Sequence, residues 1–187
     1  VRDLLTTKDD DAFEKLYERI EKYEGISDNM EVEIAKYLDQ VSDAHLSDDT
    51  KEKVRDMLRE ITEIESIGDS CFNIARTISR LRSSKEEFTE SQYDNIKQMF
   101  ELTDDALSQM SLVLIKHKRE VDVNRTFAIE SDINNYRAQL RTQNINDINE
   151  HKYSYTAGTL YMDIIQECEK LGDYIVNVVE ARMCIRK

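Results

Sequence analysis

Two acidic segments of the chain, about a hundred residues apart, have the same residue types at the same spacing. Glu65 and Asp69 lie four residues apart in the first segment, and Glu169 and Asp173 lie four residues apart in the second. Four residues are about one helical turn, so each pair of carboxylates projects from one face of a helix. Oxygen ligands without sulfur or imidazole favour hard or borderline cations, so these pairs could bind Fe, Mg, Mn or Ca.

Each acidic pair is followed by an amide and contains a glycine. Asn73 and Asn177 come four residues after the aspartates, where their side chains are either further ligands or partners in interhelical hydrogen bonds. Gly68 and Gly172 directly precede the aspartates. A glycine inside a helix costs about 1 kcal/mol relative to alanine, so we expect close approach of another helix or of a ligand at both points.

Both glutamates occupy positions of an apolar helical stripe. Leu58 and Phe72 lie seven residues either side of Glu65, and Glu169 is bracketed in the same way. A carboxylate in such a stripe costs several kcal/mol unless a cation or a hydrogen-bond donor meets it. Earlier helical segments offer matching polar side chains, which we expect to converge on the two glutamates: Glu24, Asp28 and Glu31 for the first, and Glu130 and Asn134 for the second.

Several other classes of site are disfavoured. Acids four residues apart are more often a solvated face or the partners of lysines, which leaves a purely structural role open. The three histidines, His45, His117 and His151, all fall at expected helix ends, and none follows a glutamate by three residues as in di-iron carboxylate oxidases. No nucleophile–base pair, glycine-rich phosphate loop or HExxH motif occurs, so we expect no enzyme and no catalytic residue.

Composition limits the partners and the compartment. A net charge of −13 argues against nucleic acid and anionic membrane surfaces as partners. No apolar run approaches the roughly 20 residues of a membrane span, so we expect no membrane insertion, and no signal peptide opens the chain. The cysteines are odd in number and form no CxxC pair, which favours a reducing compartment and predicts three buried thiols, at Cys71, Cys168 and Cys184.

The absence of proline and the repeat of apolar residues every three or four positions predict an all-α protein. Five long helices are expected, at about 9–44, 48–82, 90–119, 122–148 and 154–185. Ser47 is expected to cap the second, and Thr89 with Gln92 forms a capping box for the third. The stripe of the first helix places Met30 inward, and four tyrosines are expected in the core with their hydroxyl groups in water: Tyr23, Tyr37, Tyr136 and Tyr161.

The repetition extends beyond the acidic segments. Glu24 aligns with Glu130 at an offset of 106 residues, close to the offset of 104 between the two acidic segments. This predicts a duplicated three-helix unit, with residues 1–84 as the first copy and 85–187 as the second, packed together as one body. The first copy lacks most of its opening helix, of which residues 1–7 are the remaining part, and the chain is interpreted as a fragment of a longer protein.

The acidic segments resemble the signature of the PhoU family, in which each of two repeats carries a segment of the type ERIGDHAVNIAE. Here the segments are ESIGDSCFNIAR at 65–76 and EKLGDYIVNVVE at 169–180. The stretch GISDNMEVEIAKYL, together with the helix after it, is most similar to the cytoplasmic C-terminal PhoU-like domain of bacterial sodium/phosphate (Na/Pi) cotransporters. The resemblance implies a PhoU-like helical bundle of two three-helix repeats.

The same resemblance implies a non-enzymatic regulator of phosphate uptake. The protein would be cytoplasmic and membrane-associated at the inner face of the cell membrane, with the membrane domain of a phosphate transporter as its partner, in cis or in trans. Signalling proteins and a second copy of the chain are further partners to be expected. The alternatives are a free-standing phosphate transport regulator and a structural helical adaptor that holds no metal.

Metal binding by the acidic motifs is also implied by the resemblance. Its ligands would be Glu24, Asp28, Glu65 and Asp69 at one site and Glu130, Glu169 and Asp173 at the other, with Glu31, Asn73, Asn134 and Asn177 as additional ligands. Two departures from the family pattern bear on this. Ser70 and Tyr174 follow the motif aspartates where the family often has histidine, and Asn134 removes a charge from the second site.

Overall fold

The computed structural model describes residues 1–42, 46–116 and 122–185. Over these residues the secondary structure is entirely α-helical, without strands. The helices are α1 (Arg2–Thr6), α2 (Asp10–Ser42), α3 (Asp48–Ser83), α4 (Glu90–Ile115), α5 (Asn124–Asn149) and α6 (Tyr155–Met183). The predicted all-α bundle of five long helices is therefore confirmed, and the short helix α1 precedes them.

Side-chain caps mark the starts of α3 and α4, as the sequence predicts. The Ser47 hydroxyl accepts a hydrogen bond from the Thr50 amide at the start of α3. Thr89 and Gln92 form the complete capping box of α4, with bonds in both directions. These caps satisfy amide groups that have no partner within the helix, so short polar linkers are sufficient to separate the long helices.

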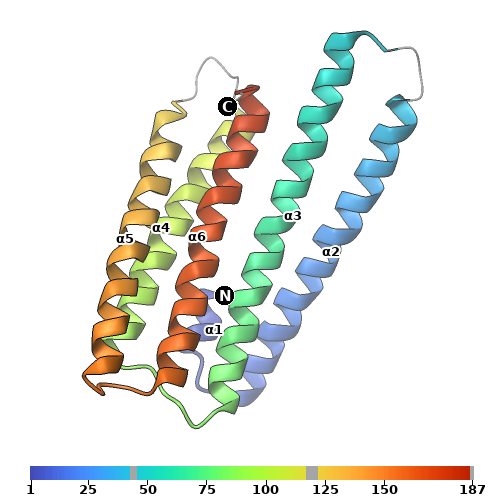
Figure 1. The fold of residues 1–187 in the computed structure, drawn as a ribbon. Helices are drawn as coiled ribbons and strands as arrows, with labels where there is room; N and C mark the ends of the chain where they lie inside the picture. The colour runs from blue at the N-terminus through green and yellow to red at the C-terminus, as the bar shows by residue number, and fades with distance from the viewer. Residues whose placement is uncertain (43–45, 117–121, 186–187) are drawn as a thin grey trace.

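The helices form two groups that meet along the middle of the molecule (Figure 1). α2 and α3 make an antiparallel pair, and α4, α5 and α6 make a three-helix bundle. The most extensive contact between helices is that of α3 with α6, which joins the pair to the bundle. α6 also packs against α4 and α5, and Ile164, Ile165 and Ile175 along it are fully buried.

α2 departs from the predicted inward stripe. Tyr23, Met30 and Tyr37 are 59%, 54% and 65% exposed, so the expectation that they lie in the core is wrong. α2 packs chiefly on α3, with α1 touching only its beginning, so the side of α2 that carries these three residues is left open to solvent. Tyr161, which is 2% exposed, and the partly buried Tyr136 do pack in the bundle as predicted. Their hydroxyl groups are not left to water, however, because the Tyr161 hydroxyl accepts a hydrogen bond from Asn95 and the Tyr136 hydroxyl donates one to Gln98.

The three thiols do not share one environment. Cys168 is fully buried, as expected, and Cys71 is partly buried. Cys184 is exposed at the C-terminal cap of α6, where it has a left-handed backbone conformation with φ of 57°. The prediction of a buried thiol is therefore wrong at Cys184, because the helix ends there and the cap is left open to solvent.

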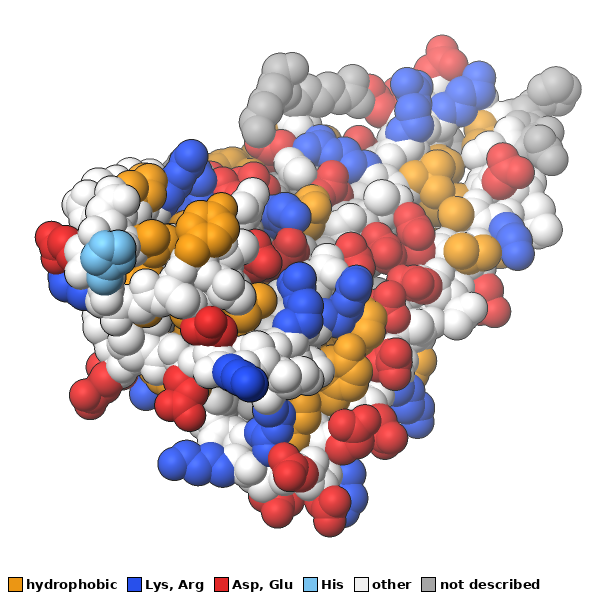
Figure 2. All heavy atoms as spheres, turned by 60° about the horizontal axis from the view of Figure 1, so that its bottom comes forward, with side chains coloured by type: hydrophobic (Ala, Val, Ile, Leu, Met, Phe, Trp, Pro, Cys, Tyr) orange, Lys and Arg blue, Asp and Glu red, His pale blue; other side chains and the backbone are white. Residues whose placement is uncertain are grey.

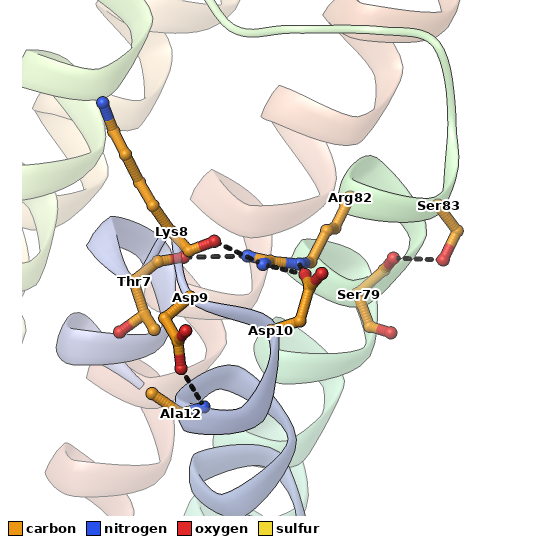
Figure 3. Close-up of polar contacts among 8 residues, drawn as sticks. All are labelled: Thr7, Lys8, Asp9, Asp10, Ala12, Ser79, Arg82 and Ser83. Carbon is orange, nitrogen blue, oxygen red and sulfur yellow. Dashed lines mark hydrogen bonds and ion pairs between the residues drawn. The ribbon is translucent and has the colours of Figure 1, made fainter.

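The N-terminal segment is held to the lower end of the pair by Arg82 of α3 (Figure 3). Its guanidinium donates hydrogen bonds to the carbonyl oxygens of Thr7 and Lys8, both at 2.8 Å, and forms an ion pair with Asp10. The same group lies 4.5 Å from the centre of the Phe13 ring. Arg82 therefore fixes the α1–α2 linker and the first turn of α2 to the end of α3.

The surface at this lower end is mixed in character. Figure 2 shows acidic and basic side chains interspersed over it, with hydrophobic side chains exposed between them. Among the helices described, none combines the length and the apolar character that crossing a bilayer requires.

Candidate cation site

The two acidic segments lie in helix pairs that pack in the same register. A Cβ atom added at Gly68 of α3 would lie 3.3 Å from the Ser27 Oγ atom of α2, and one at Gly172 of α6 would lie 3.3 Å from the Ile133 Cδ1 atom of α5. Ser27 and Ile133 are 106 residues apart, and the two glycines are 104 apart. The close helix approach predicted at both glycines is confirmed, whereas Gly25 has no such neighbour within 4 Å.

This register places five side chains of each half at matching positions. The first cluster consists of Glu24, Asp28 and Glu31 on α2 with Glu65 and Asp69 on α3. The second cluster consists of Glu130, Asn134 and Arg137 on α5 with Glu169 and Asp173 on α6.

The carboxylates of the first cluster are close enough to act on one another. Partial burial, and then the charges of Asp28 and Asp69, raise the pKa of Glu24. Burial likewise raises the pKa of Glu65, followed by the charges of Glu31, Asp28 and Asp69. Asp69 is exposed, and the other four side chains are intermediate in burial. The cluster therefore concentrates negative charge where water only partly screens it.

Hydrogen bonds satisfy only part of this cluster. The Thr62 hydroxyl donates to Glu31 at 2.8 Å, and the Ser66 hydroxyl makes a long contact of 3.4 Å with Glu65. The Oδ1 atom of Asp28 is buried and has no hydrogen-bond partner. Within the described part of the chain, no lysine or arginine forms an ion pair with any member of the cluster. An orphaned carboxylate oxygen among repelling acids is what a bound cation would satisfy, so the first cluster fits a metal ion chemically.

The side chains are not already arranged as a coordination shell. Across residues 1–42, 46–116 and 122–185, no three His, Cys, Asp or Glu side chains are placed to hold a metal ion together. Like charges push carboxylates apart, so a cation would have to draw these side chains inward as it bound.

The second cluster carries its own cation. The Arg137 Nε atom lies 3.4 Å from the Glu169 Oε1 atom, and the two side chains are 29% and 19% exposed. The Asn134 amide donates to Glu130, while its Oδ1 atom is buried without a partner. Asp173 is exposed. With an arginine on the central glutamate, this set does not fit a metal ion in the way that the first cluster does.

The motif asparagines differ between the halves. Asn177 bridges α6 and α3, since its amide donates to Glu63 at 3.0 Å and its oxygen accepts from Arg59 at 3.3 Å. The contacts of Asn73 stay within α3, with Asp69 at 3.5 Å and Arg76 at 3.4 Å. The hydrogen-bonding role that the sequence left open is therefore seen at Asn177, where it links the two helix groups.

Sequence reasoning missed Arg137. The offset that aligns Glu24 with Glu130 also aligns Glu31 with Arg137, a reversal of charge inside the duplicated motif. The signal was present, but it becomes visible only when the positions flanking the acidic residues are aligned as well.

Comparison with known proteins gives a match to a domain family and a match to a solved structure. The model of the PhoU domain family matches residues 96–181, which lie in α4, α5 and α6 and make up just under half of the chain. A comparison with curated proteins finds no match.

A crystal structure of the phosphate transport system regulatory protein PhoU from Streptococcus pneumoniae matches with a TM-score of 0.68 and 20% sequence identity. The match covers 90% of this chain and 77% of that one. The chain is thus similar to PhoU in helical fold over most of its length, and similar to the PhoU domain in sequence over residues 96–181.

Proposed function

We propose that this protein is a non-enzymatic regulator of phosphate uptake. The observation that carries the proposal is the PhoU-like fold over most of the chain, together with the PhoU domain match at residues 96–181. A bundle of long helices offers extended side faces for contact with other helices, which suits a protein that works by binding a transporter rather than by turning over a substrate.

Two of the three thiols are in environments that oppose covalent chemistry. Burial raises the pKa of Cys71 and of Cys168, so both stay protonated at neutral pH. A thiol acts as a nucleophile only as the thiolate, which an electropositive environment favours and burial opposes. Neither cysteine is therefore activated for catalysis.

The proposed partner is the membrane domain of a phosphate transporter. In the form suggested by the motif at residues 25–38, the chain is the cytosolic part of a sodium/phosphate cotransporter-type protein at the inner face of the cell membrane, and it acts in cis. A free-standing regulator that binds a transporter, or a signalling protein, in trans accounts for the same fold equally well. Cross-linking in native membranes, with identification of the attached polypeptide, separates the two forms.

The first cluster is proposed as the metal site of this regulator. Glu24, Asp28, Glu65 and Asp69 would hold the ion, with Glu31 beside them, and the orphaned Asp28 oxygen supports this assignment. A bound cation would neutralise repelling charges and tie α2 to α3, so occupancy would stiffen the pair. The oxygen-only ligand set favours Mn, Mg, Ca or Fe.

The test is phosphate uptake in the native cell. The paired variant Glu65→Gln/Asp69→Asn is compared with wild type and with Glu14→Gln/Glu18→Gln, which removes two acids at the same spacing near the start of α2. We expect the first variant to bind less metal and to change labelled phosphate uptake, and the control to do neither. Uptake that is unchanged even when the whole chain is deleted would reject the regulatory function.

A structural adaptor without metal is the second candidate, because no three metal-binding side chains of the described residues are pre-arranged around a common point. For an adaptor, protein purified without chelators would contain no bound metal, and Glu65→Ala would leave its stability unchanged.

A further inference from the structure

We infer that Arg137 is a built-in counter-cation that occupies the second cluster in place of a metal ion, so that of the two duplicated clusters only the first binds metal. The resemblance to PhoU implies metal at both. The part of this inference that concerns metal in the first cluster rests on the function proposed above, whereas the role of Arg137 rests on geometry alone.

The two clusters are comparable position by position because matching sequence positions of each helix pair face each other. Gly68 lies against Ser27 and Gly172 lies against Ile133, and these partners are related by offsets of 104 and 106 residues. The central glutamates, Glu65 and Glu169, each lie one turn before the aspartate of the motif. The side chains at these matching positions can therefore be compared directly.

The decisive difference is the charge at one pair of matching positions, on α2 in the first half and on α5 in the second. Glu31 on α2 takes its hydrogen bond from Thr62 and adds its charge to that of Glu65. At the matching position on α5 stands Arg137, whose Nε atom lies 3.4 Å from Glu169. The first cluster thus holds five carboxylates, and the second holds three carboxylates, one amide and one guanidinium.

A guanidinium in this position excludes a divalent ion on electrostatic grounds. Arginine stays protonated at every physiological pH, so it cannot make room by losing its charge. The Arg137–Glu169 pair is mostly removed from water, which strengthens the attraction within the pair and the repulsion of any second cation. The Arg137 Nε atom is buried and makes no hydrogen bond, so the contact with the Glu169 carboxylate is electrostatic.

Asn134 adds to the same effect. In the first cluster the matching residue, Asp28, presents a buried oxygen that lacks a partner. Asn134 instead donates its amide hydrogen to Glu130, which occupies one lone pair of that carboxylate. Two substitutions, at one face of α5, therefore turn a set of hard anionic ligands into a neutralised and hydrogen-bonded set.

The inference is tested by making the second cluster acidic and, separately, by placing an arginine in the first. Bound Mn²⁺ is then measured after equilibrium dialysis of metal-free protein. We expect the Glu65→Gln/Asp69→Asn variant to bind less Mn²⁺ per chain than wild type, and the Glu169→Gln variant to bind as much as wild type. The variant Asn134→Asp/Arg137→Glu should bind at least one more Mn²⁺ per chain than wild type. The reverse exchange, Glu31→Arg, should abolish Mn²⁺ binding at the first cluster and raise the melting temperature of the metal-free protein.

A second measurement needs no metal, so it separates failure of this inference from failure of the proposed metal site. Arg137→Gln should lower the melting temperature, and adding Glu169→Gln should restore most of the loss, because the carboxylate left unpaired is then replaced by a neutral amide. Arg141→Gln, an exposed arginine one turn further along α5, is the control and should change little.

Two results would overturn the inference. One is a loss of bound Mn²⁺, relative to wild type, that is as large in the Glu169→Gln variant as in the Glu65→Gln/Asp69→Asn variant. The other is a pair of substitutions at Arg137 and Glu169 whose effects on the melting temperature simply add. Absence of Mn²⁺ from wild type, combined with strong coupling between these two residues, would instead reject the proposed metal site and leave Arg137 as the counter-cation.

Discussion

Removing the Arg82 guanidinium should release the N-terminal segment from the end of α3. Arg82→Ala deletes two hydrogen bonds of 2.8 Å to the carbonyl oxygens of Thr7 and Lys8, the ion pair with Asp10 and the contact with the Phe13 ring. Asp10 is 92% exposed, so its ion pair adds little. Two charge-assisted hydrogen bonds, discounted because water replaces part of them, and one cation–π contact add up to about 2–3 kcal/mol.

That free energy is measurable as a shift in melting temperature. With an unfolding entropy near 2.1 cal/mol/K per residue, a chain of this length should lose roughly 5–8 °C in thermal unfolding monitored by circular dichroism. The loss should be accompanied by faster tryptic cleavage after Lys8, because the linker that carries it is no longer held.

The matched control is Arg80→Ala, two residues earlier on α3. Its guanidinium bonds to Thr77 within the same helix and lies 3.6 Å from Asp163, with the Arg80 side chain 62% exposed. We expect that substitution to cost under about 1 kcal/mol. If both variants melt at the same temperature and are cut after Lys8 at the same rate, Arg82 does not hold the linker and the reasoning is refuted.

Three further outcomes can be checked with simple assays. Gly25→Ala should raise the free energy of unfolding by about 1 kcal/mol, because a Cβ atom there meets nothing within 4 Å and alanine is the better helix former; no gain in chemical denaturation would contradict this. Gly158→Ala should lower the free energy of unfolding, because its Cβ atom would lie 2.5 Å from the Ile148 Cδ1 atom. An unchanged denaturation midpoint would show that the Ile148 side chain moves aside without cost. In thiol labelling of the native protein, Cys184 should react first and Cys168 last, because Cys184 is exposed whereas burial raises the pKa of Cys168; equal rates would mean that α6 opens readily.

Several helix starts could be predicted because they are specified by local signals that act within a few residues. The capping box at Thr89 and Gln92 and the cap at Ser47 are short-range features, and they occur in the structure as predicted. The two aligned glycines also predicted where neighbouring helices come close, and both Gly68 and Gly172 have such a neighbour.

Which side of α2 is buried could not be predicted in the same way. A periodic stripe shows that a helix has an apolar side, but it does not say whether a neighbour covers that side. The residues Tyr23, Met30 and Tyr37 satisfy the period and yet are exposed, because α2 packs chiefly on α3. The environment of Cys184 was missed for a related reason, since the burial of a residue at a helix end depends on which other elements pack near that end.

The proximity of the acids in the first cluster was predicted from the sequence, whereas the charge balance of the second cluster was not. The acids of the first cluster lie near one another, as their mutual effect on the pKa of Glu65 shows. In the second half the acidic residues alone did not reveal Arg137, because a set of possible ligands says nothing of the cations around it. Counter-charges three or four residues from a motif are as informative as the motif itself when a glutamate is partly buried.

Three poorly exposed glutamates of α6 each form an ion pair with a basic side chain of the protein. On α6, Glu169 meets Arg137 at 3.4 Å, Glu167 meets Lys170 at 2.8 Å, and Glu180, which is 2% exposed, meets Arg59 at 3.0 Å. Each of these carboxylates obtains its cation from the protein itself. Glu65 on α3 stands at the position equivalent to Glu169 and has a serine hydroxyl and three nearby acids instead. Because the close approaches at Gly68 and Gly172 pair matching positions, Glu169 with its arginine is the comparison for Glu65, whose lack of a cation from the protein is the basis of the proposed metal site.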